Sequence, residues 1–146
     1  MSILQTAIGE GLPPLVKPPI TQEQLRYYAN ASGDHSPIPL DEEAARRVGP
    51  NSAIAHGMLS MAFLGQFISH HLSDTPDAFI SQLEVRFHKM VHLGDVLTCH
   101  GIVMARDTFE NGSQSVSIEC WILNQKGEKV TIGEATVTIP LQIIPS

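Results

Sequence analysis

The chain has 146 residues, a formal net charge of -6 at pH 7 and only two cysteines. This length allows one domain with one core, and we expect a single domain that spans residues 1–146. The negative charge argues against nucleic acid and membrane surfaces as partners, because both are bound through clustered Lys and Arg. No apolar run approaches the ~20 residues needed to span a bilayer, and Met1 to Gly11 lacks the pattern of a signal peptide. We therefore expect a soluble cytoplasmic protein.

The first elements follow a proline-rich arm. Leu12 to Pro19 carries four prolines, so this segment is predicted to be extended and without regular hydrogen bonding. Thr21 and Gln24 form a capping-box pattern, which predicts a helix that continues until Ser32-Gly33. A short surface helix is predicted from Asp41 to Arg47, because acids begin this run and basic residues end it.

A longer helix is predicted over Ile54 to Leu72. Apolar residues cover most of its circumference, which is typical of a helix buried on more than one side. They are Ile54, Met58, Met61, Ala62, Leu64, Phe67, Ile68 and Leu72.

After Pro76 the apolar residues alternate, which predicts strands. The first strand places Phe79, Leu83, Val85 and Phe87 on one face and Gln82, Glu84, Arg86 and His88 on the other. Further strands are predicted at Val96–Ala105, Gln114–Leu123 and Val130–Ile139, with turns at Asn111-Gly112 and Lys126-Gly127. This order predicts an α+β fold in which an antiparallel sheet wraps around the long central helix, the hot-dog arrangement, although it also suits other α+β folds. Cys99 and Cys120 lie in strand-like apolar runs and fit buried reduced thiols.

Two segments resemble one enzyme family. They are Ser32-Gly33-Asp34-His35-Ser36-Pro37-Ile38-Pro39-Leu40-Asp41 and Ile54-Ala55-His56-Gly57-Met58-Leu59. Together with Tyr28-Ala29 and Gly94-Asp95-Val96-Leu97, they are similar to the MaoC-like dehydratases and (R)-specific enoyl-CoA hydratases. The resemblance implies the hot-dog fold, a homodimer or heterodimer of hot-dog subunits, and a place in fatty acid metabolism. It implies a lyase that adds water to an enoyl thioester of coenzyme A or acyl carrier protein, or removes it, without a cofactor.

The resemblance also implies a catalytic pair of which this chain has one member. Asp34 occupies the family's Asp position, whereas Pro39 stands where the family has its catalytic His. A proline side chain cannot transfer a proton, and loss of one acid/base group typically costs ~10²–10⁴ in rate. His35 is the candidate substitute, although neighbouring side chains in an extended loop point in opposite directions. Asp34 could instead serve only to stabilise a turn.

The second segment is predicted to support the thioester. Gly57 is expected at the start of the central helix, where its backbone N–H would stabilise the thioester oxygen; a small residue needed only for packing is the alternative. His56 is expected to orient the loop at the same helix start. Ser36, His56 and Met58 are the candidate substrate-binding residues, and Gly65 stands where the family sometimes has a helix serine.

No metal site is predicted, because neighbours such as His70 and His71 point about 100 degrees apart on a helix. Met61, Phe63 and Met90 are either tunnel-lining or ordinary core residues. Two other functions compete with hydration. Pro39 favours a non-catalytic hot-dog subunit that binds acyl thioesters or completes a catalytic partner. A lone Asp34 would also suit a hot-dog thioesterase.

Overall fold

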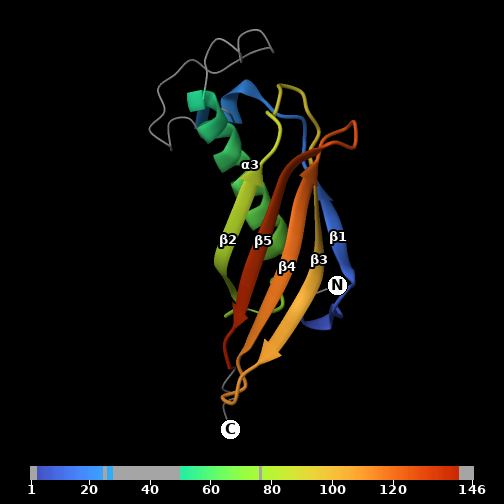
Figure 1. The fold of residues 1–146 in the computed structure, drawn as a ribbon, viewed down its shortest axis with the longest axis vertical. Helices are drawn as coiled ribbons and strands as arrows, with labels where there is room; N and C mark the ends of the chain where they lie inside the picture. The colour runs from blue at the N-terminus through green and yellow to red at the C-terminus, as the bar shows by residue number, and fades with distance from the viewer. Residues whose placement is uncertain (1–2, 25, 28–49, 76, 142–146) are drawn as a thin grey trace.

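A computed structural model describes residues 3–24, 26–27, 50–75 and 77–141 of the chain. Within these ranges a single antiparallel sheet lies against one long helix, with the helix crossing one face of the sheet (Figure 1). The elements are η1 (Ile3–Gln5), β1 (Gly11–Val16), α3 (Pro50–His70), β2 (Phe79–Phe87), β3 (Thr98–Thr108), β4 (Gln114–Leu123) and β5 (Lys129–Ile139).

The sheet has the strand order β1-β3-β4-β5-β2. β3, β4 and β5 follow one another as hairpins, and both predicted turns are confirmed. Gly112 and Gly127 have φ angles of 88° and 76°, which residues with a side chain rarely adopt. The bounds of β4 agree with the prediction, whereas β3 begins two residues later than expected and continues to Thr108.

The core lies between α3 and the inner face of the sheet. Leu64, Phe67 and Ile68 of the helix are fully buried and meet inward-facing residues of the strands. Gly101 makes this approach possible, because a Cβ there would lie 2.9 Å from Cε2 of Phe67. Burial of each large apolar side chain stabilises the fold by about 1.5–3 kcal/mol.

The proline-rich arm is not free of regular pairing, so that prediction was wrong. β1 pairs with β3 in antiparallel register, and the register shifts between Leu12 and Leu15. The shift coincides with Pro13 and Pro14, which have no N–H to donate. Prolines are tolerated because β1 is an edge strand.

β2 departs from the predicted alternation at its beginning. A register shift lies between Ile80 and Gln82, where two residues of one strand oppose a single residue of its neighbour. As a result Phe79 is 51% exposed, whereas Ile80, Leu83 and Val85 are partly buried against the core. The prediction that Phe79 shares the inward face was wrong, because the bulge reverses the alternation before Gln82.

The helices confirm some predicted bounds and change others. The capping box is confirmed, since the Thr21 N–H donates to Gln24 Oε1 at 2.9 Å and the Gln24 N–H donates to Thr21 Oγ1 at 3.2 Å. α3 begins at Pro50, four residues before the predicted start, because proline suits the first turn of a helix. The end of the first helix at Ser32-Gly33 and the short helix from Asp41 to Arg47 lie outside the described residues. None of the helices in the described part of the chain is long and apolar enough to cross a membrane.

Candidate active site

The first family-like segment lies outside the described residues. This applies to Asp34, His35, Ser36 and Pro39. Their predicted roles therefore stay predictions, and the site is built below from the second segment and from the strands beside it.

Gly57 and His56 lie within α3 and not at its start. The helix begins at Pro50, so Gly57 stands seven residues inside it. In a regular helix an N–H at this depth donates to the carbonyl four residues earlier, whereas only the first N–H groups are free. The expectation that Gly57 and His56 mark the helix start was wrong. The sequence-based start overlooked Pro50 as a first-turn residue.

A pocket of about 590 Å³ lies between α3 and the β2 edge of the sheet, and we call it the edge pocket. Its lining residues are Met61, Leu83, Glu84, Val85, Arg86, Ile132, Gly133 and Glu134. Met61 follows Gly57 by one helical turn, about 6 Å along the axis. The edge pocket therefore lies beside the family-like segment of α3.

Gly133 is a lining residue of the edge pocket that has no room for a side chain. A Cβ at this position would lie 2.9 Å from the backbone oxygen of Glu84, 3.2 Å from Cγ1 of Val85 and 3.4 Å from Sγ of Cys120. The first contact is with backbone, which cannot move aside as a flexible side chain could. The sequence analysis did not select Gly133, although a glycine inside a predicted strand is a known signal of close approach.

Three residues were predicted to line a tunnel or to belong to the core, and the structure separates them. Met61 lines the edge pocket and is 39% exposed. Phe63 is a core residue, buried to 2% exposure, with the ammonium of Lys17 at 4.8 Å from its ring centre. Met90 is partly buried and does not line the edge pocket. Met58, predicted to bind substrate, is also partly buried and does not line it.

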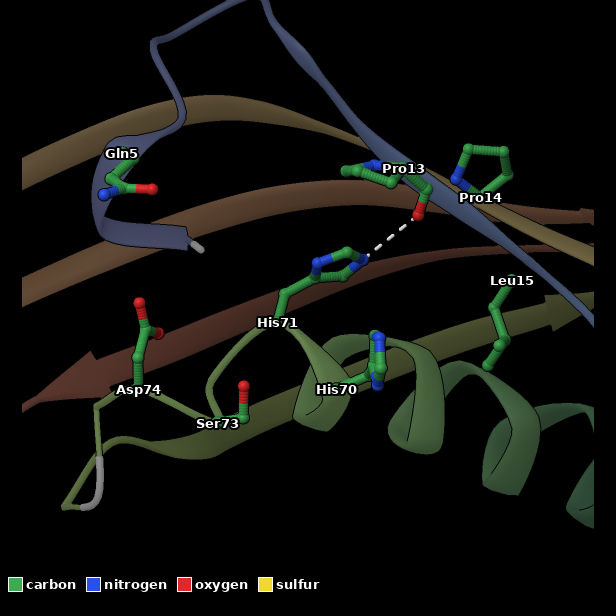
Figure 2. A pocket seen from close by; sticks show the side chains of 8 residues that line it. All are labelled: Gln5, Pro13, Pro14, Leu15, His70, His71, Ser73 and Asp74. Carbon is green, nitrogen blue, oxygen red and sulfur yellow. Dashed lines mark hydrogen bonds between the residues drawn. The ribbon is translucent and has the colours of Figure 1, made fainter. Parts of the chain in front are cut away.

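A second pocket of about 350 Å³, the helix-end pocket, lies at the far end of α3 (Figure 2). Its lining residues are Gln5, Pro13, Pro14, Leu15, His70, His71, Ser73 and Asp74. Nε2 of His71 lies 3.1 Å from the carbonyl oxygen of Pro13 and donates to it, because a carbonyl can only accept. The Ile3 N–H donates to the His71 carbonyl at 3.0 Å. These bonds hold β1 and η1 against the end of α3.

No metal centre is formed by the residues that the structure describes, since they contain no group of three or more His, Cys, Asp or Glu side chains able to hold an ion. His70 and His71 contact each other edge to face, with ring centres 5.5 Å apart. The ring of His100 instead stacks on Trp121 at 5.7 Å.

The cysteines are free and buried, as predicted. Burial raises the pKa of the Cys99 thiol and that of the Cys120 thiol to about 12. A thiol that keeps its proton at neutral pH is a poor nucleophile, so neither cysteine is suited to covalent catalysis.

The third family-like segment forms a turn before β3. Gly94 has a φ of 85°, and the buried carboxylate of Asp95 accepts hydrogen bonds from the backbone N–H of His92 at 2.8 Å and from Gln125 at 2.9 Å. Leu97 is fully buried behind this turn. Gly94, Asp95 and Leu97 therefore each have a structural role in the turn, which accounts for their presence in this segment.

The comparisons with known proteins agree with this geometry. A sequence profile described as "MaoC like domain" matches residues 4–119. The chain is 32% identical over 124 residues to the mitochondrial 3-hydroxyacyl-(acyl-carrier-protein) dehydratase of Arabidopsis thaliana. The aligned region covers 82% of this chain and 70% of that protein. It is 26% identical over 133 residues to the (R)-specific enoyl-CoA hydratase of Rhodospirillum rubrum, covering 91% and 89%.

The solved structures show the fold. The MaoC-like dehydratase from Rhodospirillum rubrum superposes with a TM-score of 0.75 at 21% identity and covers 99% of both chains. The predicted α+β hot-dog fold is confirmed. With its profile match over most of the chain and a sheet laid against one long helix, this chain belongs to the MaoC-like dehydratase domain family.

Proposed function

We propose that the protein is an enoyl-thioester hydratase, and in the reverse direction a 3-hydroxyacyl-thioester dehydratase. The observation that carries this proposal is the edge pocket, which is lined by Leu83 and Val85 of β2 and by Met61, one helical turn from Gly57 on α3. The apolar part of this lining suits an acyl chain, while Glu84, Arg86 and Glu134 give the pocket a charged part as well. The names of the relatives support the same chemistry.

In the proposed reaction, the oxygen of water bonds to carbon 3 of the enoyl thioester while carbon 2 gains a proton. Asp34 takes a proton from the water, and a proton is returned to carbon 2, so the net change is the addition of one water molecule. An ordinary Asp has a pKa near ~3.9, so this role requires that its surroundings raise the pKa. His35 is the proposed second proton carrier, and Ser36 and His56 the proposed substrate contacts.

Negative charge develops on the thioester oxygen, and the Gly57 N–H is the proposed donor to it. Because Gly57 lies inside α3, its N–H can reach the substrate only if it leaves or shares its bond within the helix. This requirement makes Gly57 the most exacting part of the proposed mechanism.

The proposed substrate carriers are coenzyme A and acyl carrier protein, and no cofactor is proposed. The proposed compartment is the cytoplasm, which suits two unpaired buried cysteines. The proposed assembly is a dimer of hot-dog subunits.

The test is the loss of enoyl-thioester absorbance when the purified protein is given crotonyl-CoA. We expect turnover by the wild type and a loss of ~10²–10⁴ in rate for Asp34→Asn. Asp41→Asn, in the same segment, is the matched control and should keep its rate. An unchanged rate in Asp34→Asn would contradict the mechanism.

A second candidate function follows from Pro39. If the wild type is silent and Pro39→His hydrates crotonyl-CoA, the chain is a non-catalytic subunit whose chemistry belongs to a partner. Release of free thiol from acyl-CoA without hydration would instead show a thioesterase.

A further inference from the structure

The charges of the described residues separate toward the two ends of the sheet. At one end, the connection after β2 and the β4–β5 hairpin carry the exposed lysines Lys89, Lys126 and Lys129, and we call this the basic end. At the opposite end, the connection from α3 to β2 and the β3–β4 hairpin carry exposed acids, which are Asp74, Asp77, Asp107 and Glu110. A chain with a net charge of -6 therefore has one end at which cations gather.

The basic end is also the end at which α3 begins. α3 ends at His70 and β2 returns from Phe79, so the end of β2 lies beside the first half of the helix (Figure 1). The β4–β5 hairpin reaches the same end of the molecule (Figure 1). Gly57 of the family-like segment lies in this half of α3. An anion attracted to the basic end therefore arrives beside the proposed thioester site.

The acids at the basic end are already engaged. The carboxylate of Glu128 forms an ion pair with the ammonium of Lys89. Asp95 is 7% exposed, and its carboxylate accepts two hydrogen bonds. Lys126 and Lys129 form no ion pair with the described residues. Their two positive charges are therefore available to a partner.

Hydrogen bonds hold the β4–β5 hairpin in a fixed shape. Oδ1 of Asn124 accepts the backbone N–H groups of Lys126 and Glu128, each at 3.0 Å. The side chain of Gln125 donates to Oδ1 of Asp95 at 2.9 Å, which ties the hairpin to the turn before β3. A surface that is ordered before binding loses less entropy when a partner docks.

An aromatic ring lies among these cations. Nζ of Lys129 is 5.9 Å from the ring centre of Trp121, which is partly buried on the outer face of the sheet. Trp121 is opposite Ile132, and Ile132 is opposite Arg86, so a further cation lies in the same row across the strands. Tryptophan is enriched among the residues that contribute most to protein–protein binding.

A row of like charges borders the basic end on the outer face. Glu119 of β4 pairs with Glu134 of β5, and Glu134 pairs with Glu84 of β2. All three are exposed, and residues directly opposite one another share a face of the sheet. These carboxylates repel an acidic partner, so such a partner is confined to the basic end.

We propose that the basic end docks the acidic surface of an acyl carrier protein, with Lys126 and Lys129 as its main contacts. The inference rests on the proposed function, because the docked carrier would deliver its thioester to the site beside Gly57. Complementary charge at such a surface raises the rate of association and selects the partner.

The arrangement of the cations favours a protein over the phosphates of coenzyme A. Phosphate groups are typically bound by donors that converge in a concave site. Lys89, Lys126 and Lys129 line neither the edge pocket nor the helix-end pocket. Cations spread around a tryptophan instead fit the broad surface of a protein.

The fluorescence of Trp121 tests the docking without turnover, because this is the single tryptophan of the chain. The full chain is titrated with a holo acyl carrier protein that lacks tryptophan and carries no acyl group. We expect a saturable fluorescence change whose affinity falls ~10-fold or more between about 0.05 M and about 0.5 M NaCl, since salt screens exposed charges.

Neutralising the lysines provides the second measurement. Lys126→Gln and Lys129→Gln should each weaken docking by ~3-fold, and the double variant by ~10-fold or more, since each removes one attractive charge. Thr108→Glu is the matched control, because it changes the net charge as much as either single variant but at the opposite end of the sheet. It should dock like the wild type. Circular dichroism confirms that each variant folds.

The outcomes separate this inference from the proposed function. No response to the carrier protein, or an equal loss of affinity in Thr108→Glu and the lysine variants, would overturn the inference. A response to coenzyme A alone, abolished in the double variant, would assign the lysines to phosphate groups and overturn it as well. Docking of the carrier without hydration of crotonyl-CoA would contradict only the proposed function.

Discussion

The edge pocket lies beside the middle of α3 and the helix-end pocket at its C-terminal end, and the two differ in what surrounds them. The edge pocket combines apolar residues such as Met61, Leu83 and Val85 with the charged Glu84, Arg86 and Glu134, and it lies at a strand whose outer edge is unpaired in the described residues. In the helix-end pocket a hydrogen bond joins two of the lining residues, His71 and Pro13, and the backbone of His71 also accepts the Ile3 N–H. The difference indicates that the helix-end pocket holds the fold together through its hydrogen bonds, whereas the edge pocket, with apolar and charged residues side by side, is suited to a ligand that has both an apolar and a polar part.

The largest expected effect comes from adding a side chain at Gly133, which lines the edge pocket. Gly133→Ala brings a Cβ to 2.9 Å from the Glu84 backbone oxygen, so we expect a loss of stability of about 1–3 kcal/mol. We also expect slower hydration of crotonyl-CoA. Urea unfolding and the absorbance assay measure the two effects.

The matched control is Gly65→Ala, because a Cβ there meets nothing within 4 Å. Alanine in a helix is favoured over glycine by about 1 kcal/mol, so this variant should be at least as stable as the wild type. Equal stability and equal hydration rates in the two variants would contradict the role assigned to Gly133.

The next effect concerns acyl-chain length. Met61→Trp fills part of the edge pocket and should slow the hydration of long enoyl thioesters by ~10-fold or more relative to crotonyl-CoA, since each buried CH₂ contributes about 0.8 kcal/mol. Met104→Trp is the control, because Met104 is 51% exposed on β3 and does not line the pocket. A chain-length profile unchanged by Met61→Trp would place the acyl chain elsewhere.

A substitution in the helix-end pocket should lower the stability of the protein and leave its turnover unchanged. His71→Phe keeps a ring against Phe67 but removes the donor to the Pro13 carbonyl, at an expected cost of about 1–3 kcal/mol. His70→Phe, at the exposed neighbouring position, should cost much less. Loss of turnover in a His71→Phe protein that remains folded would show that this pocket also takes part in function.

The smallest effect at neutral pH comes from the buried thiols. The pKa of each thiol is about 12 in the folded protein and near 9.0 when exposed, so unfolding releases protons above pH 9.0. The free energy of unfolding should therefore be unaffected by these groups below that pH and fall as the pH rises toward 12. Cys120→Ala should make the decline shallower in urea titrations; an identical decline would mean that the thiol is not buried as described.

Some of this architecture follows from local sequence. The alternation of β4, the turn glycines Gly112 and Gly127, and the Thr21–Gln24 capping box were predictable because each depends on neighbours within a few residues. The bulge that exposes Phe79 was not predictable, since it depends on how β2 pairs with a strand distant in the chain.

The candidate site likewise has a part that the sequence predicts and a part that depends on distant pairing. The sequence motifs, by themselves, identified the family and selected Asp34 and Gly57. The tertiary structure alone brought Met61 and Gly133 to one pocket, left the outer edge of β2 unpaired in the described residues, and aligned Glu84 with Glu134 and Glu119. Local patterns determine helices, strands and turns because they act through adjacent residues. A pocket and a sheet edge arise only when distant strands come into register.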